Sequence, residues 1–451
     1  MTDIENRTGL SYVDIDNNRK LVIDPDNVFW GIMPKKSSSG YLLPDEVASL
    51  YKKVKTKLDK EMQSFRFGSN LTAVYINPTD RCNAACSYCY IPPEIRKNGA
   101  QMTKEQLDFV MGRITDYFKN SKKKPVIVFH ASEPLLAKDI IFDAMDKFSD
   151  RFYFGLQTNA LLIEKADVAF LKKHRVGVGI SLDSFDPRVN NRQRVSIKGG
   201  GNFAKAVKAI EWFDSYEGLN VIATITRLNV SHLPDLVKFL HAKKVNCVLL
   251  NPVRVTQKSV LGLKPGQKVL SEYFIKAVET AMELSKNTRR KITIGNFANV
   301  ILAIIAPTGR RLMCDISPCG GGRCFLSITA KGDMIPCGEF ISIKGFSGGN
   351  IFDAPISHAM QSKPFKKIRS RVVEDIAECG ACNFRNICGA PCPAELHSLG
   401  NMKQPSVFCE FYKDIIRYAF KLIDEDKVKY LFRKKSLRHF EYEYKLNNFK
   451  L

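Results

Sequence analysis

Apolar and polar positions alternate in a repeating order over the middle of the chain. Short runs of β-branched and aromatic residues, typical of buried strands, occur at 71–77, 125–130, 152–157, 176–182, 220–226 and 245–251. Between these runs the apolar spacing changes to that of amphipathic helices, at 103–119, 136–149, 163–173, 202–216 and 232–242. Such alternation indicates parallel βαβ units, so we expect an α/β fold. A partial (β/α)6 TIM-like barrel suits six strands, and an open parallel sheet is the alternative.

The regions on either side of this core have other sequence patterns. Residues 42–67 have helical spacing, and a further helix is expected near 271–287. After residue 312 the chain changes to short strands, glycine-rich turns and cysteines, and it closes with a helix and a basic, aromatic tail. The expected parts are an N-terminal extension (1–70), a core barrel (71–255), a linker helix region (256–312), a cysteine-rich domain (313–412) and a C-terminal helix and tail (413–451).

Composition narrows the class of protein. The chain has 451 residues and 45% apolar residues, which is ordinary for a globular protein of two or three domains. It has no apolar run of about 18 residues, so we expect no transmembrane helix and no membrane partner. Residues 1–7 lack the basic start and apolar core of a secretory signal, so we expect a cytoplasmic protein.

The formal net charge of +23 admits two interpretations. One is an acidic partner, such as nucleic acid, an acidic peptide or an electron-donor protein steered by charge. The other is a lysine-rich solvated surface. Clusters such as Lys122–Lys124 lack the interleaved aromatic residues or motifs of nucleic-acid readers. The second interpretation is favoured, and we expect no nucleic-acid partner.

Thirteen cysteines without a secretory signal point to metal rather than to disulfides. Cys247 lies inside a predicted strand and is expected to be a core residue. Cys82, Cys86 and Cys89 share one loop after the first strand of the core. Three thiolates can hold three irons of a cubane cluster and leave the fourth iron open for chemistry, whereas structural sites are closed by four ligands. A zinc knuckle that lacks a ligand is the alternative interpretation.

The C-x3-C-x2-C spacing, with the aromatic Tyr88 before the last cysteine, resembles the radical S-adenosylmethionine (SAM) superfamily. The resemblance implies a [4Fe-4S] cluster whose open iron binds SAM. It also implies the reaction: the reduced cluster cleaves SAM to methionine and a 5′-deoxyadenosyl radical, which abstracts hydrogen from a substrate. The protein's own task is then to orient the reactants and to exclude competing reactions.

Polar residues at the ends of later strands extend the resemblance. Ser132-Glu133-Pro134 stands where the family has Gly-Gly-Glu-Pro, with Ala131 and Ser132 in place of the two glycines. Arg194 matches the family arginine that pairs with the SAM carboxylate, a task suited to its planar fork. Helix capping is the alternative role for Glu133. By resemblance, the SAM-binding residues are Tyr88, Ser132, Glu133, Gln157, Asn159, Ser181, Arg194 and Leu250.

The second cysteine field resembles the SPASM extension of radical SAM enzymes. It contains G-x4-C, then C-x2-C-x5-C-x3-C, then a lone cysteine, and a zinc ribbon is the alternative. The resemblance implies two auxiliary [4Fe-4S] clusters, three clusters in all, with electron transfer as the auxiliary role. One cluster is assigned to Cys319, Cys324, Cys337 and Cys392, and the other to Cys379, Cys382, Cys388 and Cys409. Cys314 is left over, as a substitute ligand for Cys319 or as a free thiol.

The resemblance also implies a peptide or protein substrate, as in maturases of ribosomally made peptides. Anaerobic sulfatase maturases place an aspartate base directly after the cysteine matching Cys337, but here that residue is Gly338, and Glu339 is the candidate catalytic base. A small-molecule dehydrogenase and a zinc-stabilised nucleic-acid-binding protein are further alternatives. The expected partners are a peptide, with an acidic leader that residues 1–70 would bind, and a flavodoxin-type or ferredoxin-type electron donor.

Overall fold

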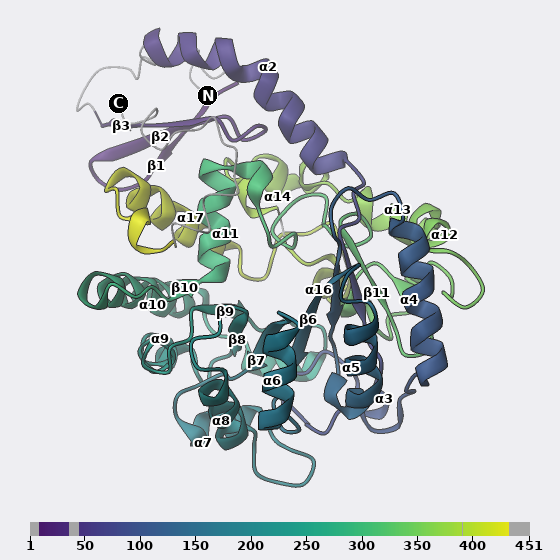
Figure 1. Cartoon of the computed structure of the whole chain (residues 1–451). Coiled ribbons are helices and arrows are strands. Elements are labelled where there is room, and N and C mark those ends of the chain that lie inside the picture. The colour runs from purple at the N-terminus through teal and green to yellow at the C-terminus, as the bar shows by residue number, and fades with distance from the viewer. Residues whose placement is uncertain (1–8, 36–44, 390, 433–451) are drawn as a thin grey trace.

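The computed structural model describes residues 9–35, 45–389 and 391–432. Its centre is a nine-stranded sheet of order β10-β9-β8-β7-β6-β5-β4-β11-β12 (Figure 1). The six predicted strands are confirmed, and each pairs in parallel with the next. They are β4 (Ala73–Ile76), β5 (Val126–Phe129), β6 (Tyr153–Thr158), β7 (Gly177–Ser181), β8 (Leu219–Ile225) and β9 (Cys247–Pro252).

Strand β8 shows how the sheet acquires two different faces. Its residues alternate between buried and half-buried over the whole strand. Val221 and Ala223 are buried in the main hydrophobic core, whereas Ile222 and Thr224 line a central cavity. The period of two thus supplies one face for packing and one for a site.

The five predicted core helices are also confirmed, and they cover the outside of the sheet (Figure 1). The start of one of them is fixed by a capping box, in which Thr103 Oγ1 accepts from the Gln106 amide at 3.2 Å and Gln106 Oε1 accepts from the Thr103 amide at 2.9 Å. The helices are α4 (Lys104–Phe118), α5 (Lys138–Lys147), α6 (Lys165–Lys173), α8 (Phe203–Phe213) and α9 (Leu233–Ala242). Two short helices lie in connections of the barrel: α3 (Pro93–Asn98) between β4 and α4, and α7 (Pro187–Gln193) between β7 and α8.

The sheet extends beyond the predicted strands at both edges. β10 (Thr293–Ile294) pairs in parallel with β9. β11 (Phe325–Ile328) pairs in parallel with β4, and β12 (Met334–Ile335) pairs antiparallel with β11. The cysteine-rich segment therefore contributes strands to the same sheet as the barrel. Because the order ends at β10 and β12, the barrel is partial, as the sequence predicts.

Three further helices pack against one another near the β10 edge of the sheet. They are α10 (Gln267–Thr288), α11 (Gly295–Ile305) and α17 (Cys409–Asp424). The Phe274 and Phe411 rings pack α10 on α17 at 5.3 Å between centroids. The linker region thus contains two helices rather than the one predicted. Helix α11 is buried on nearly all sides and has no charged face, so its sequence does not look like that of a surface helix.

The cysteine-rich segment after β12 consists of short helices and turns. They are η5 (Gly338–Phe340), α12 (Ile356–Gln361), α13 (Lys363–Arg369), η6 (Val373–Asp375), α14 (Ala377–Gly380), α15 (Arg385–Cys388) and α16 (Pro393–Ser398). Single turns elsewhere are η1 (Pro134–Ala137), η2 (Val230–His232), η3 (Lys258–Leu263), η4 (Pro307–Gly309) and η7 (Val428–Tyr430). The basic part of the predicted tail, 433–451, lies outside the described residues.

The N-terminal unit packs on the upper part of the molecule (Figure 1). Its predicted helix is confirmed as α2 (Asp45–Phe67), and an unpredicted antiparallel sheet precedes it, formed by β1 (Ser11–Asp14), β2 (Arg19–Ile23) and β3 (Trp30–Pro34). Trp30 Nε1 donates to the Ile304 carbonyl at 3.0 Å, and its ring lies 5.6 Å from that of Phe420. The unit therefore rests on α11 and α17 rather than on the barrel helices.

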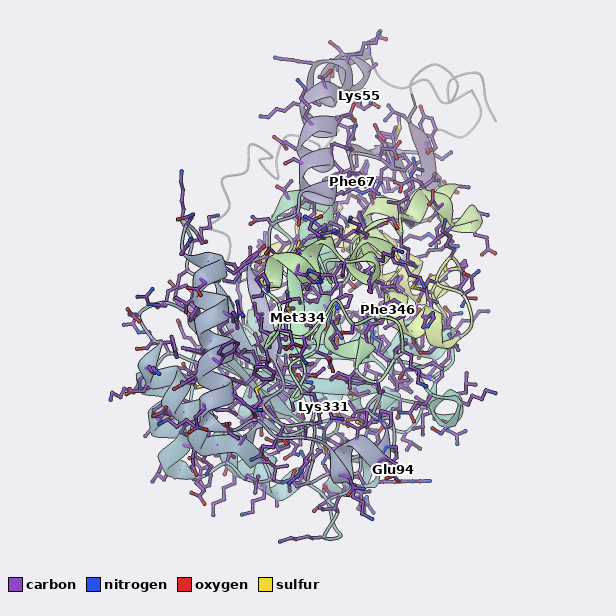
Figure 2. All side chains as sticks on the ribbon, turned by 90° about the vertical axis from the view of Figure 1, so that its right-hand side faces the viewer. Lys55, Phe67, Glu94, Lys331, Met334 and Phe346 are labelled. Atoms are coloured by element: carbon purple, nitrogen blue, oxygen red, sulfur yellow. The ribbon has the colours of Figure 1, made fainter. Side chains whose placement is uncertain are left out.

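Side chains follow the expected division between interior and surface. Met334 and Phe346 lie inside the molecule, whereas Lys55 and Glu94 extend from its periphery (Figure 2). Among the described residues, no helix is both long enough and apolar enough to span a bilayer.

Candidate active site

The strand ends and the segments above them enclose a central cavity of about 500 Å³. One side is formed by the residues that follow β4 to β9. The opposite side, which we call the roof, is formed by α11, α16, α17 and residues 311–340. Carboxyl ends of parallel strands are where α/β proteins of this kind hold their ligands, so the cavity is the candidate active site.

The cluster loop, residues 82–89, places Cys82, Cys86 and Cys89 on the strand side of the cavity. All three are free thiols. The Ala84 amide donates to Cys82 Sγ at 3.4 Å, and Asn159 Nδ2 lies 3.9 Å from the same sulfur. Three unpaired thiols with N–H donors aimed at sulfur suit an iron–sulfur cluster, whose properties depend on such hydrogen bonds.

Five more cysteines line the roof side of the same cavity, and we call them the roof cysteine group. The structure brings together the four predicted ligands of one auxiliary cluster and adds the leftover Cys314 beside them. The Gly321 amide donates to Cys319 Sγ at 3.4 Å, which again provides a donor for a thiolate. The members are Cys314, Cys319, Cys324, Cys337 and Cys392.

The distal cysteine group, Cys379, Cys382, Cys388 and Cys409, lies on α14, α15, the turn between them and the start of α17. None of these thiols lines the central cavity. The pKa of Cys379 is raised to about 11 by burial and by the neighbouring Cys409 and Cys382 thiols, so these three lie close together. Arg371 feels the charge of Cys319 and Cys392 as well as that of Cys379 and Cys388, which places it between the two groups.

The cysteine groups do not have the geometry of a single-metal site. In the part of the chain that the structure describes, no three His, Cys, Asp or Glu side chains converge closely enough to hold one ion. A zinc ion needs its ligands about 2.3 Å from one point, whereas a cubane binds its cysteines at separate corners.

Most of the predicted SAM-binding residues meet at the cavity. Gln157 lies in β6 and Asn159 directly follows it, Ser181 ends β7, and Leu250 lies in β9. Ser132 also lines the cavity, although its hydroxyl donates to the Asp80 carbonyl at 2.7 Å.

Glu133 lies behind this wall rather than in it. Its carboxylate accepts from the Thr158 hydroxyl at 2.8 Å, from the Asn159 amide at 2.8 Å and from the Leu135 amide at 3.1 Å. The bond from the Leu135 amide caps η1, so Glu133 has the helix-capping role that was the alternative prediction for it. Its role toward SAM stays a prediction.

Arg194, Tyr88 and Asp183 form a buried hydrogen-bonded network at the cavity wall. The Tyr88 hydroxyl donates to Asp183 Oδ2 at 2.5 Å, and Arg194 Nη1 donates to the Tyr88 oxygen and lies 3.3 Å from Asp183 Oδ1. Burial raises the pKa of Asp183, and the Arg194 guanidinium opposes that shift. Arg194 Nε has no partner among the described residues, so the fork keeps a donor for a carboxylate. Asp183 was not predicted as a site residue, although it lies only two positions after Ser181, which was.

Charged residues from distant segments complete the roof side. Burial raises the pKa of Glu339 to about 7, and Arg254 opposes the rise. Arg254 also lies 3.7 Å from Glu395. Asn296 of α11 accepts from the Leu250 amide at 2.7 Å and so fixes that edge of the wall. Sequence reasoning missed Arg254 and Asn296, because neither belongs to a motif.

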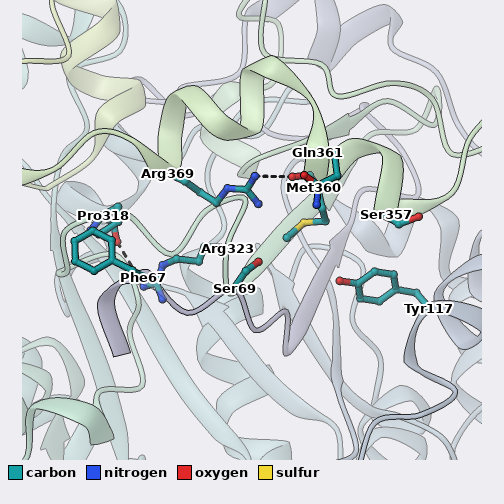
Figure 3. Close-up of a pocket in the computed structure, with 9 residues that line it drawn as sticks. All are labelled: Phe67, Ser69, Tyr117, Pro318, Arg323, Ser357, Met360, Gln361 and Arg369. Carbon is teal, nitrogen blue, oxygen red and sulfur yellow. Dashed lines mark hydrogen bonds between the residues drawn. The ribbon is translucent and has the colours of Figure 1, made fainter. Parts of the chain in front are cut away.

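A second hollow of about 440 Å³ lies at the surface between the end of α2, α4, α12 and α13 (Figure 3). Phe67 and Tyr117 border it with 45% and 38% of their surface exposed. Arg369 Nη2 donates to the Met360 carbonyl at 2.6 Å, so this arginine is held against the wall. The hollow contains none of the predicted site residues.

Family patterns match two parts of the chain. The pattern of the radical SAM superfamily matches residues 76–240, and that of SPASM, an iron–sulfur cluster-binding domain, matches residues 319–383. Residues 82–89 and most of the roof cysteine group fall within these matches.

Several known proteins are similar over most of their length. An uncharacterized protein of Archaeoglobus fulgidus is 41% identical over 92% of this chain and 94% of its own. A cysteine-type anaerobic sulfatase-maturating enzyme of Clostridium perfringens is 24% identical over 75% of this chain and 93% of its own. The solved structure of native anSMEcpe with bound AdoMet and Cp18Cys peptide has the same fold, with a TM-score of 0.68 and 21% identity over 79% of this chain and 99% of its own.

Proposed function

The chain belongs to the radical SAM superfamily and carries a SPASM iron–sulfur domain, and we propose that it modifies a residue of a peptide or protein by hydrogen abstraction. [4Fe-4S] clusters and SAM are its cofactors. The proposed ligands of the SAM-binding cluster are Cys82, Cys86 and Cys89. When bound and reduced, that cluster supplies the electron that cleaves SAM into methionine and the radical that abstracts hydrogen.

One observation carries the proposal: the cysteines of the cluster loop and those of the roof cysteine group line the same cavity. A substrate in that space would lie between the SAM site and an auxiliary cluster. The radical left on the substrate after hydrogen abstraction could then lose an electron to the roof side. The distal cysteine group lies outside the cavity and would pass that electron onward, with Arg371 between the groups.

The chain's own residues would bind and orient the cofactor. Arg194 and Ser181 are proposed to hold the SAM carboxylate, while Tyr88 and Asp183 hold Arg194 in place. Gln157, Asn159 and Leu250 would line the rest of the SAM site. The roof covers the strand ends and would keep water from the reacting atoms, which suppresses side reactions.

The residue at position 338 favours maturation of a ribosomally made peptide over maturation of a sulfatase. The similarity to a sulfatase-maturating enzyme supports a peptide or protein substrate for this chain as well. The aspartate base expected after the cluster cysteine is replaced here by Gly338. Glu339 is the proposed base in its place, since it lines the cavity and its Oε2 has no partner among the described residues.

Two partners belong to the proposal. A flavodoxin-type or ferredoxin-type donor would supply the electron, and the net charge of +23 suits an acidic protein of that kind. The same charge suits an acidic leader on the peptide, with the unit of β1 to β3 and α2 as its proposed dock.

The test begins with anaerobic reconstitution using iron and sulfide. Dithionite and SAM are then added with short peptides encoded beside the gene, and 5′-deoxyadenosine and peptide mass are followed by mass spectrometry. The expected result is 5′-deoxyadenosine together with a peptide whose mass has changed. Formation of 5′-deoxyadenosine without any change in a peptide or protein would contradict the substrate class, and no 5′-deoxyadenosine would contradict the function itself.

A further inference from the structure

Gly338 has no side chain, and the imidazole ring of His130 lies next to the position that a side chain would take. A Cβ atom at position 338 would lie 3.0 Å from His130 Cε1, 3.3 Å from His130 Nδ1 and 3.7 Å from Ser327 Oγ. The first distance is tighter than most real contacts of a Cβ atom, so a side chain here would have to displace the imidazole. His130 and a carboxylate at position 338 therefore compete for the same space, and this chain has His130.

Four polar atoms without partners belong to residues of the same cavity, and two of them, His130 Nδ1 and Ser327 Oγ, lie near the Cβ position of residue 338. They are His130 Nδ1, Ser327 Oγ, Tyr90 Oη and Glu339 Oε2, which make no hydrogen bond within the described residues. All four residues line the central cavity, and we call them the polar wall. The His130 ring also packs edge-on against Tyr75 at 5.3 Å, which fixes its position.

Buried polar atoms without hydrogen-bond partners destabilise the protein unless a ligand supplies the missing hydrogen bonds. A buried polar atom without a partner costs about 1–3 kcal/mol, and natural proteins contain few of them. Four such atoms line one cavity, and they come from Tyr90 just after the cluster loop, His130 just after β5, Ser327 in β11 and Glu339 in η5. Together they indicate a surface that a polar ligand completes.

Resting on the peptide-modifying function proposed above, we propose that the polar wall binds a short, uncharged side chain of the substrate that both donates and accepts hydrogen bonds. Hydroxyl and carboxamide groups have this chemistry. The hydroxyls of Ser327 and Tyr90 can each donate or accept, so they suit such a partner. Burial lowers the pKa of His130 to about 4, so its imidazole is neutral near pH 7 and offers one donor and one acceptor.

Charge and size both restrict the ligand. Glu339 and Arg254 both line the cavity and are of opposite sign, so neither a substrate carboxylate nor a substrate cation is selected by charge. Either charge would also have to leave water. The cavity of about 500 Å³ must hold SAM as well, so only a short side chain fits.

The test uses defined probes on the oxidised, cluster-loaded protein with SAM bound. Saturation-transfer NMR compares N-acetyl-serine amide and N-acetyl-asparagine amide with the alanine, aspartate and lysine analogues. We expect at least fivefold stronger saturation of the serine or asparagine probe than of the other three. Stronger serine than asparagine signal would identify the hydroxyl as the preferred group. The proposal is overturned if neither polar probe gives a stronger signal than the alanine analogue, if the aspartate or lysine analogue gives the strongest signal, or if no probe gives a signal.

Variants test which residues are responsible. His130→Phe keeps a ring against Tyr75 but removes both nitrogens, and with Ser327→Ala it should abolish the preference for the polar probes. Gly338→Ala should weaken the preference by displacing the imidazole. Ser285→Ala removes another buried hydroxyl without a partner, on α10 and away from the cavity, and should change nothing. A full preference in the His130→Phe/Ser327→Ala variant overturns the proposal.

Failure of this inference can be told apart from failure of the proposed function. SAM affinity by calorimetry and 5′-deoxyadenosine formation with dithionite are measured on the same samples. Normal SAM binding and cleavage with no probe discrimination contradicts only the polar wall.

Discussion

At the scale of single residues, the best-defined contacts are those around Asp183. Its Oδ1 accepts from the Thr224 amide at 2.9 Å and its Oδ2 from the Tyr88 hydroxyl at 2.5 Å. Arg194 completes the group. Asp183 thus joins the end of β8, the cluster loop and the arginine proposed to bind SAM, so it acts as a positioning residue.

Asp183→Asn should weaken SAM binding by about ten- to a hundredfold. The substitution removes a hydrogen-bonded buried charge, worth about 1.5–3 kcal/mol, and about 1.4 kcal/mol corresponds to tenfold in affinity. Calorimetry on the oxidised, cluster-loaded protein measures the change. The control is Asp167→Asn on α6, which removes the carboxylate that lies 2.9 Å from Lys138 Nζ. Its SAM affinity should stay within twofold of that of the unmodified protein. An unchanged affinity in Asp183→Asn would contradict the positioning role.

Cys86→Ala should abolish 5′-deoxyadenosine formation, because two thiols cannot hold the proposed cluster for SAM. Cys247→Ala makes the same chemical change in strand β9, away from the cavity, and should leave SAM cleavage normal. The rate is measured by liquid chromatography with excess dithionite. Normal cleavage by Cys86→Ala would mean that the loop is wrongly assigned.

The sequence predicted those site residues that belong to motifs, because ligand spacing is local. Cys82, Cys86 and Cys89 were predicted from their spacing, and Ser181 and Arg194 from the family resemblance; the structure places all five at one cavity. Arg254 and Asn296 reach the cavity through the tertiary fold, so no local pattern reveals them.

At the scale of elements, helix α2 is fastened to the loop that carries Cys319. Arg66 donates to both carboxylate oxygens of Glu374 at 2.8 Å and, through Nε, to the Ser317 carbonyl at 2.5 Å. Arg323 Nη1 donates to the Phe65 carbonyl at 2.8 Å. The N-terminal unit therefore supports one wall of the roof.

Arg66→Met should loosen both partners of this contact. Removing one member of a buried ion pair costs about 3–5 kcal/mol, and the half-exposed Glu374 places the expected loss at the lower end. We expect at least tenfold faster amide exchange at residues 60–68 and 314–324 by hydrogen–deuterium mass spectrometry. Lys55→Met breaks the exposed Lys55–Asp59 pair on the same helix and should have little effect. Unchanged exchange in Arg66→Met would contradict the fastening.

The predicted strands and helices of the barrel are correct because each has one buried face and hence a clear period. The elements that were missed lack that signal. Helix α11 is buried on nearly all sides, and the N-terminal strands are short. Short strands were expected after residue 312, but the pairing of β11 with β4, a strand distant in sequence, has no local signal.

At the scale of the whole molecule, the account requires three clusters in one chain. About twelve irons per chain are expected, four for each cubane. Cys382→Ala should lower this to about eight and leave SAM cleavage intact, because the distal cysteine group lies outside the cavity. Iron analysis and 5′-deoxyadenosine formation measure the two effects. Loss of SAM cleavage, or unchanged iron, would contradict the separation of the sites.

The most direct measurement is the electron paramagnetic resonance spectrum of the dithionite-reduced, cluster-loaded protein before and after SAM is added. We predict that SAM shifts the signal of one [4Fe-4S]+ cluster, and that Cys86→Ala removes the shift while Cys382→Ala retains it. A spectrum that SAM leaves unchanged in the unmodified protein would contradict an open iron at the cluster loop, and with it the proposed function.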